Sequence, residues 1–226
     1  MFGPSAAQGY DRSTTLYSPD GRIIQTEYAR EAMRKGSIAI GLRSNHGVVL
    51  AGKLQAIDLD YPNTKISQVD HQITAIFSGY AADGRALINR AKVEAAVHKM
   101  TYDEQIDLKQ LSNRLADYAH VFTQQGGLRP LGVGLLIGGI DEYDNEPRIY
   151  FLNPGGGLVE TRGKAIGDGD AKAMKFLKDK HKEKPIDDMT LEELKQLAKE
   201  TIEFTSEEPV TDDLVEIWGR GKNGET

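Results

Sequence analysis

The sequence predicts a layered α+β fold in which two packed β-sheets lie between outer helices. Strand-like and helix-like segments occur in separate blocks, in the order strands, helix pair, strands, helix pair, strand. The helical segments carry their apolar residues on one side, so each helix can cover one face of a sheet. The 226 residues contain no internal repeat and no low-complexity linker, which indicates one main domain behind an N-terminal extension.

The first predicted element is a helix that begins at Ser18-Pro19-Asp20 and ends at Gly36. A capping side chain, a proline in the first turn and an early acid are typical of a helix start. A glycine can adopt the left-handed conformation that ends a helix. The apolar residues between them recur at helical spacing, at Ile24, Tyr28 and Ala32.

From Ser37 the apolar period changes to two, which predicts strands. Ile38, Ile40 and Leu42 share one face of the first strand, and Asn45–Gly47 forms the turn to the next. The strands predicted in this block are 38–42, 48–51, 65–69 and 73–78.

Two long helices follow, of which the second carries a continuous apolar stripe from Leu108 to Phe122. Asp144-Asn145 predicts a hairpin turn, and Thr190 with Glu193 predicts a capping box that opens the last helix. The later strands are predicted at 131–140, 148–152, 157–166 and 213–219, with another helix near 171–180.

Composition excludes several classes of function. The net charge of −6 disfavours a nucleic-acid partner, which would need a basic face. The absence of cysteine excludes disulfides, thiolate chemistry and cysteine-ligated zinc. No apolar run is long enough to cross a bilayer, and the first residues lack the features of a signal peptide. We therefore expect a cytoplasmic protein with no membrane partner.

A glycine-containing turn at Gly167-Asp168-Gly169 follows a strand and opens a helix, as a dinucleotide-binding loop would. However, Lys172 stands where the third glycine would be, and the two aspartates, Asp168 and Asp170, would repel a pyrophosphate. We therefore expect either aspartate to serve as a plain helix N-cap. No cofactor is expected. The five histidines are scattered, which gives no metal site, and no G-x-S-x-G elbow occurs.

An N-terminal nucleophile is the remaining chemistry. Ser37 begins the first strand directly after Gly36, and Lys65 lies one strand pair later. In enzymes of this kind a hydroxyl attacks while its own α-amine takes the proton. The nitrogen of Ser37 is an amide here, so the base is missing unless the chain is cut at Gly36.

Several motifs resemble the proteasome α-subunit family. The N-terminal signature is carried by Tyr10-Asp11-Arg12, Ser18–Arg22 and Gln25–Ala29. Further matches are Lys35-Gly36-Ser37, Thr64-Lys65-Ile66, Ser78-Gly79 with Ala82-Asp83, Gly126–Val133 and Ala165-Ile166-Gly167. The resemblance runs from about Tyr10 to Ile166, continues more loosely to Trp218, and is nearest to archaeal α subunits.

The resemblance implies a four-layer α-β-β-α sandwich of the N-terminal nucleophile hydrolase type with an extra N-terminal helix. Residues 1–35 would be a gating tail and helix, and residues 36–226 the sandwich domain. It also implies a non-catalytic subunit that forms a heptameric α ring on a ring of proteolytic β subunits. The partners implied are other α subunits, β subunits, the C-terminal tails of a regulatory ATPase or other activator, and unfolded protein substrates.

The resemblance also assigns roles to individual residues, with none of them catalytic. Tyr10, Asp11, Pro19 and Tyr28 resemble the cluster that holds the gate open, with Met1–Gly9 as the tail that obstructs the pore. Lys65 and Gly79 resemble the activator-docking pocket, and Ser37 and Lys65 occupy the slots of the β-subunit threonine and lysine. The axial constriction would be formed by Gln125, Gly126, Gly127 and Leu128.

Two other classes stay open at this stage. One is an autoprocessed N-terminal nucleophile hydrolase that uses Ser37, which would lose Met1–Gly36 from its mature mass. The other is a dinucleotide-binding enzyme, which nucleotide would stabilise against heat.

Overall fold

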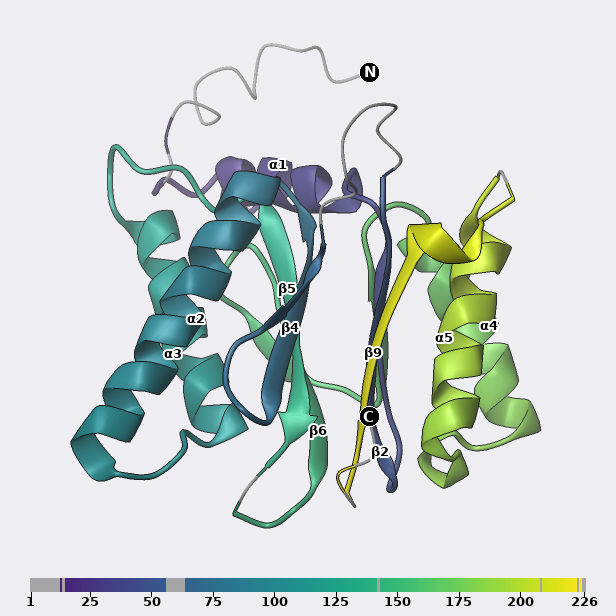
Figure 1. Cartoon of the computed structure of the whole chain (residues 1–226). Helices are drawn as coiled ribbons and strands as arrows, with labels where there is room; N and C mark the ends of the chain where they lie inside the picture. Colours follow the sequence, from purple (N-terminus) through teal and green to yellow (C-terminus); the bar gives the residue numbers. More distant parts are fainter. Residues whose placement is uncertain are drawn as a thin grey trace.

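A computed structural model describes residues 13, 15–55, 64–141, 143–207, 209–222 and 224. Figure 1 shows two β-sheets packed face to face, with one helix pair outside each sheet and a further helix, α1, across one end. This is the four-layer sandwich that the sequence led us to expect.

The first sheet has the strand order β8-β1-β2-β9 and is antiparallel throughout. Its outer face is covered by α4 (Asp170–Glu183) and α5 (Leu191–Thr205). Its strands are β1 (Ala39–Arg43), β2 (Gly47–Lys53), β8 (Gly163–Ile166) and β9 (Val215–Gly221). Short 3₁₀ helices at Ile186–Asp188 and Asp212–Leu214 precede α5 and β9.

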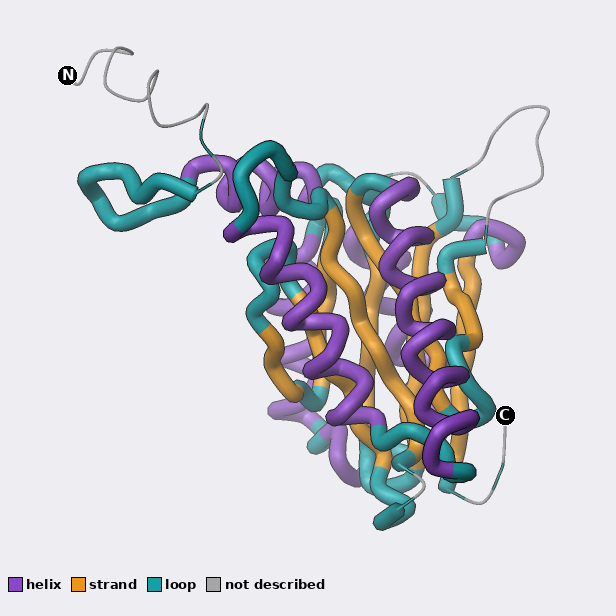
Figure 2. Tube along the Cα trace, turned by 90° about the vertical axis from the view of Figure 1, so that its left-hand side faces the viewer, coloured by secondary structure: helices purple, strands orange, loops and turns teal. Residues whose placement is uncertain are grey.

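The second sheet has the order β3-β4-β5-β6-β7 and is also antiparallel. Figure 2 shows α2 (Ala81–Tyr102) and α3 (Leu108–Gln124) lying across the outer face of this sheet. Its strands are β3 (Ile66–Gln68), β4 (Ile73–Gly79), β5 (Val133–Ile140), β6 (Pro147–Leu152) and β7 (Leu158–Glu160).

The core consists of three apolar layers, one between the sheets and one beneath each helix pair. Strand β2 shows how one strand serves two of them. Val48 and Leu50 belong to the layer between the sheets, whereas Val49 and Ala51 belong to the layer beneath α4 and α5. Because side chains alternate along a strand, an almost continuous apolar run can bury both of its faces.

The N-terminal helix differs from its prediction in both ends and in its face. Helix α1 spans Ile24–Arg34, and Ser18 instead closes a turn in which its amide donates to the Arg22 carbonyl oxygen. Ala29 and Met33 are buried in place of Tyr28. The signature residues before the helix build this turn rather than a cap.

Gly36 is not in the left-handed conformation that the sequence predicted for it, because its φ angle is not positive. A Cβ atom at this position would lie 2.1 Å from the backbone nitrogen of Gly79. The glycine is therefore needed for the close approach of two backbones.

The single strand predicted at 157–166 is two strands in different sheets. Leu158–Glu160 pairs with β6, whereas Gly163–Ile166 pairs with β1 in the other sheet. The predicted aspartate cap of α4 is also wrong, since Gly169 is the N-cap residue and makes no side-chain cap. The capping box of Thr190 and Glu193 at α5 is confirmed.

Candidate functional site

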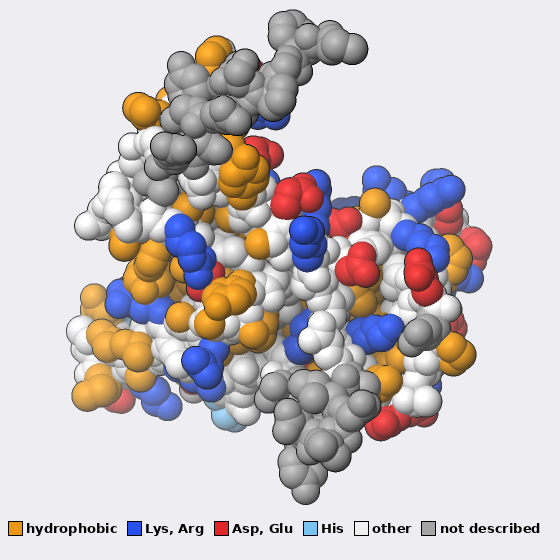
Figure 3. All heavy atoms as spheres, turned by 90° about the horizontal axis from the view of Figure 1, so that it is seen from above, with side chains coloured by type: hydrophobic (Ala, Val, Ile, Leu, Met, Phe, Trp, Pro, Cys, Tyr) orange, Lys and Arg blue, Asp and Glu red, His pale blue; other side chains and the backbone are white. Residues whose placement is uncertain are grey.

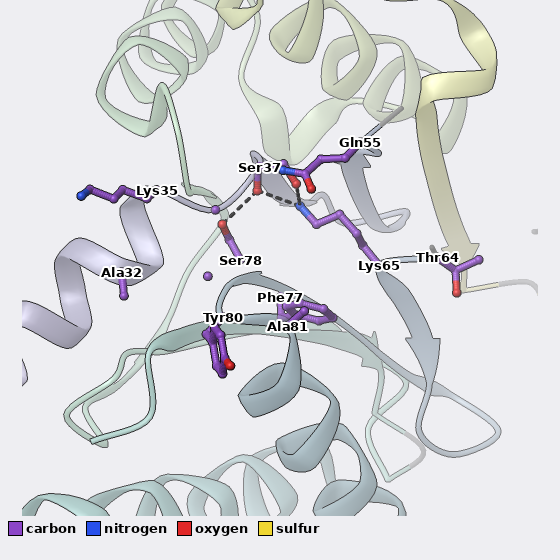
Figure 4. A pocket seen from close by; sticks show the side chains of 12 residues that line it. Ala32, Lys35, Ser37, Gln55, Thr64, Lys65, Phe77, Ser78, Tyr80 and Ala81 are labelled. Carbon is purple, nitrogen blue, oxygen red and sulfur yellow. Dashed lines mark hydrogen bonds between the residues drawn. The ribbon is translucent and has the colours of Figure 1, made fainter. Parts of the chain in front are cut away.

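A pocket of about 420 Å³ opens at the end of the sandwich where α1 lies. Three chain segments that are far apart in the sequence meet there. They are the α1–β1 connection with Ser37, the start of β3 with Lys65, and the β4–α2 junction with Gly79 and Tyr80. Figure 4 shows the Lys65 side chain reaching across the pocket toward Ser37.

Lys65 is buried, with 8% of its surface exposed, and among the described residues its ammonium group contacts neutral oxygens. Nζ lies 2.7 Å from the Ser37 carbonyl oxygen, 2.8 Å from Ser37 Oγ and 3.1 Å from the Ile38 carbonyl oxygen. Among the residues described, no carboxylate forms an ion pair with it. The family resemblance placed Ser37 and Lys65 in related slots, and the fold brings them into contact.

Burial lowers the pKa of Lys65 to about 7, and the nearby carboxylate of Glu216 offsets part of this effect. Glu216, on β9, does not reach the ammonium. Its Oε2 accepts instead from the backbone amides of Lys65 and Ile66, at 2.8 and 3.2 Å. Within the described part of the chain, the desolvated ammonium therefore has no counter-ion at contact distance, which is costly for a buried charge.

Tight backbone packing fixes the floor of the pocket. Ser78 Oγ donates to the Ser37 carbonyl oxygen at 2.9 Å and lies 3.2 Å from the Met33 carbonyl oxygen. Gly79 has a φ of +119°, and a Cβ atom there would meet the Gly132 carbonyl oxygen at 2.2 Å. A side chain at Gly79 would therefore clash with the segment that leads into β5. These contacts hold Ser37 in a fixed position relative to Lys65.

The glycine turn before α4 packs against the same segment of the chain. A Cβ atom at Gly167 would lie 2.7 and 2.8 Å from the carbonyl oxygens of Gly36 and Ser37. The amide of Asp168 donates to the Gly36 carbonyl oxygen at 2.7 Å. The Asp168 amide is therefore already hydrogen-bonded within the chain and is not available to bind a pyrophosphate.

A second pocket, of about 350 Å³, lies on the other side of Tyr80 and is lined by Tyr28, Ala32 and Arg129 among others. Ala32 and Tyr80 line both pockets, so the two are adjacent. Arg129 lies over the Tyr80 ring, with 5.4 Å between Cζ and the ring centroid. The predicted gating residue Tyr28 and the predicted docking residue Lys65 thus occupy neighbouring hollows.

A bidentate ion pair between Asp83 and Arg129 ties α2 to the segment before β5. The two guanidinium nitrogens lie 2.6 and 2.9 Å from the Asp83 oxygens, and the Gly132 amide donates to Asp83 Oδ2 at 2.8 Å. Nothing in the sequence indicated that these two residues pair, although both belong to motifs quoted for the family resemblance. The two charged residues can be read from the sequence, but only the fold shows that they form an ion pair.

Only some of the remaining predicted residues are described by the structure. Tyr10 and Asp11 lie outside the described residues. Pro19 is exposed in the turn before α1, and Tyr28 is 53% exposed on α1. The predicted constriction, Gln125–Leu128, forms a largely exposed turn after α3 in which the Leu128 amide donates to the Gln125 carbonyl oxygen. This turn lies at the same end of the molecule as α1 (Figure 1).

The described residues contain no group of three or more His, Cys, Asp or Glu that could hold a metal ion. Within the same part of the chain, none of the helices is both long and apolar enough to cross a membrane.

The two-sheet sandwich between helix pairs, with a serine at the first strand and a lysine beside it, defines the N-terminal nucleophile hydrolase fold. Comparison with known proteins identifies the family. Residues 33–218 match the family described as proteasome subunit, and residues 10–32 match the N-terminal signature of the A-type proteasome subunits. The chain belongs to the proteasome subunit family, in its α-type branch.

Curated relatives of the chain include archaeal proteins named as proteasome alpha subunits. That of Methanobrevibacter smithii is 41% identical over 221 residues, which cover 95% of this chain and 84% of the relative. That of Methanocaldococcus jannaschii is 42% identical, over 88% of this chain and 74% of the relative. That of Archaeoglobus fulgidus is 39% identical, over 92% and 83%. The predicted resemblance to archaeal α subunits is therefore confirmed.

Proposed function

We propose that this chain is a non-catalytic subunit that forms the outer ring of a proteasome core particle. In this role it gates the passage of protein substrates and docks an activator, such as a regulatory ATPase, in ATP-dependent protein degradation in the cytoplasm. The observation that carries the proposal is the buried ammonium of Lys65, which has no anionic partner among the described residues and lies in a pocket large enough for a peptide end. Membership of the α-type branch supports the remainder.

The docking step follows from the chemistry of the pocket. A C-terminal carboxylate would supply the counter-ion that Lys65 lacks, in a charge-assisted hydrogen bond. Lys35 also lines the pocket and adds a second positive charge. The bound carboxylate would offset part of the desolvation cost of the buried Lys65 ammonium. The burial of Lys65 therefore favours binding of a carboxylate.

Substitution of Lys65 tests the docking step. In particles assembled with β subunits, Lys65→Met should abolish stimulation of peptide hydrolysis by a regulatory ATPase, because the carboxylate loses its partner. Lys53→Met is the matched control, since Lys53 Nζ lies 3.2 Å from Ser206 Oγ, outside this pocket. A tail peptide with an amidated C-terminus should fail to bind even to the unmodified particle. Full stimulation of the Lys65→Met particle would reject docking at this lysine.

Docking should also depend on pH. The pKa of Lys65 is about 7 in the empty pocket, so above that pH the carboxylate must bind a neutral amine or draw in a proton. We expect the affinity for a tail peptide, measured by fluorescence anisotropy, to fall by up to about tenfold per pH unit above 7. An affinity that is constant from pH 7 to 9 would contradict this.

The proposed gate consists of the tail Met1–Gly9 with Tyr10, Asp11, Pro19 and Tyr28. Its support is the exposed hydrophobic surface at this end. Figure 3, which looks onto this end, shows hydrophobic side chains gathered beside charged ones. Those exposed on α1 and the segment before it are Leu16, Tyr17 and Tyr28. Such surface in a monomer favours contact with neighbouring subunits.

Deletion of Met1–Gly9 tests the gate. It should raise the basal hydrolysis of a small peptide by the assembled particle, because the obstruction is removed. The number of β-subunit active sites, counted by labelling to completion with an active-site probe, should be unchanged. Equal basal rates with and without the tail would reject a gate made by this segment.

We propose that the chain has no peptidase activity, because the nitrogen of Ser37 is not a free amine. Its nitrogen is in a peptide bond with Gly36, and the Gly36 carbonyl oxygen is held by the Asp168 amide. A peptide nitrogen has no basic lone pair, so the α-amine mechanism lacks its base. Intact mass distinguishes this from an autoprocessed hydrolase: we expect Met1–Gly36 to be retained. Loss of that segment together with peptide cleavage by the chain alone would reject the proposal.

Ring formation is the remaining part of the proposal. The purified chain should assemble into rings visible by negative-stain electron microscopy, alone or together with β subunits. A chain that stays monomeric at high concentration and never assembles with β subunits would contradict a ring-forming role.

A further inference from the structure

Ser37 and Lys65 also form a pair with the geometry of a serine nucleophile and its base. Ser37 Oγ and Lys65 Nζ are 2.8 Å apart, a hydrogen-bond distance suited to proton transfer. In Figure 4 the two groups point toward each other at the edge of the pocket. We propose that Ser37 is a modification site that accepts one acyl group from a small activated ester, with Lys65 as the base.

The contacts of Lys65 suit a neutral amine as well as an ammonium. As an ammonium it donates three hydrogen bonds, to Ser37 Oγ and to the carbonyl oxygens of Ser37 and Ile38. As an amine it can still donate to both carbonyl oxygens, while its lone pair accepts from the Ser37 hydroxyl. The pair therefore needs no rearrangement to exchange a proton, and the serine–lysine arrangement is a known alternative to a histidine base.

The space around Ser37 can hold an acyl group. Ser37 lines the pocket of about 420 Å³ and a second one of about 770 Å³ on its other side. Lys35 and Gln55 line both pockets. Ser37 is half-buried, so its hydroxyl is reachable without unfolding. The two openings together are larger than an acetyl or a short acyl chain requires.

The reaction balances within the pair. The Ser37 hydroxyl proton passes to Lys65 Nζ as Oγ forms a bond to the acyl carbon. The bond between the acyl carbon and the leaving oxygen then breaks, and the alcohol or phenol leaves as its anion. The product is an acyl ester on Ser37 beside a protonated Lys65. Lys65 then releases the proton to solvent, and the acyl ester on Ser37 is the species that the test detects.

The base form of Lys65 is accessible at neutral pH. Burial lowers its pKa to about 7 although Glu216 opposes the shift. The charged residues that line the two pockets or act on Lys65 are Lys35, Lys53, Asp168, Lys172, Glu207 and Glu216. The acylation rate should therefore rise about tenfold between pH 6 and pH 8 and then level off, following the fraction of neutral Lys65.

A second lysine–serine pair in the chain provides an internal control. Lys53 Nζ lies 3.2 Å from Ser206 Oγ, which accepts from it. The Ser206 hydroxyl itself donates to the Ile202 carbonyl oxygen at 2.9 Å, so its proton is directed away from Lys53. If proximity of a lysine to a serine were sufficient, both Ser37 and Ser206 would be acylated. If the lysine has to accept the hydroxyl proton, only Ser37 of this pair should be acylated.

The test treats the full chain with p-nitrophenyl acetate and follows it by intact mass and peptide mapping. We expect one acetyl group on Ser37, none on Ser206, and a rate that rises through about pH 7 to a plateau. Ser37→Ala should remove this label. Lys65→Met should slow the labelling of Ser37 at least tenfold, and Lys53→Met should leave it unchanged.

Three results would overturn the proposal: an unlabelled Ser37, equal labelling of Ser206, or a Ser37 rate that keeps rising with hydroxide above pH 8. Because the pH profile and the Ser206 comparison use the unmodified chain, they decide the matter even where Lys65→Met does not fold. The readout uses the isolated chain and does not depend on activator docking.

Discussion

The two most informative charged sites of this protein are buried to the same degree but differ in their partners. Lys65 and Asp83 are each 8% exposed. Asp83 accepts two hydrogen bonds from the Arg129 guanidinium and one from the Gly132 amide. Lys65 contacts two carbonyl oxygens and one hydroxyl oxygen. The first charge is neutralised within the fold, whereas the second has no ionic partner among the described residues.

This difference is what we expect if Asp83 is a structural charge and Lys65 has the docking role proposed above. Removal of one member of a buried ion pair is costly, because the other charge is left unpaired. A buried charge that has no ionic partner costs stability while it is present, so its removal should not destabilise the fold. We therefore expect opposite consequences for stability and function at the two sites.

The largest expected effect is the pH dependence that Lys65 gives to stability. Its pKa is about 7 in the folded chain and near its ordinary value of 10.5 when unfolded. Between these values the unfolded chain binds more protons, so stability rises with pH by up to roughly 1.4 kcal/mol per unit. Below pH 7 the ammonium is buried at full cost, and above 10.5 the difference vanishes.

Comparison of the unmodified chain with Lys65→Met measures this contribution. In urea unfolding, the variant should be more stable at pH 6, and its advantage should shrink steadily up to pH 9. Other titrating groups cancel in the difference. A constant difference across this range would mean that Lys65 keeps its charge in the fold, and the contrast with Asp83 would then disappear.

The next largest effect is expected at Asp83. Asp83→Asn removes the charge that holds Arg129 and weakens the bond from Gly132, and should lower the free energy of unfolding by about 2 kcal/mol. The Arg129 side chain is 57% exposed, so water can take up part of the loss. Rings should still form and Lys65 should still dock activator tails.

An exposed ion pair provides the control for Asp83. Glu27 and Arg30 on α1 are 40% and 44% exposed, and Glu27→Gln should change stability by less than about 0.5 kcal/mol. Equal effects of Asp83→Asn and Glu27→Gln in the same unfolding experiment would show that burial does not distinguish the two pairs.

A smaller effect than at Lys65 or Asp83 is expected at Asp141, which combines features of both sites. Asp141 pairs with Arg148 at 3.1 Å, yet burial, together with the neighbouring Asp107 carboxyl, raises its pKa to about 6. A raised folded pKa contributes stability that is fully present below about pH 4 and is lost as the pH rises through 6. Asp141→Asn should remove roughly 1 kcal/mol of this pH dependence.

Urea unfolding at pH 5 and pH 7 checks the Asp141 prediction. The unmodified chain should lose stability between the two values relative to Asp141→Asn. If the relative stability instead increases with pH, the Arg148 contact outweighs the burial and the Asp107 carboxyl.

The sequence predicted most of the elements because their signals are local. The capping box of Thr190 and Glu193 and the apolar stripe of α3 each depend on residues within one or two turns. The strand at 157–166 was misread because both of its halves have strand character. Which sheet each half joins is decided by its hydrogen-bonding partners in β6 and β1, which are distant in the sequence.

The candidate site shows the same division. The sequence by itself determined that Ser37 follows a peptide bond and that glycines stand at 36, 79 and 167. Only the tertiary structure decided that Lys65 meets Ser37, and that Gly36 and Gly167 are needed for close packing rather than for a helix stop or a phosphate. The physical reason is that desolvation and contact depend on the packing of residues distant in the chain. Residue type and spacing set the charge of Lys65, and the fold set its partners and its pKa.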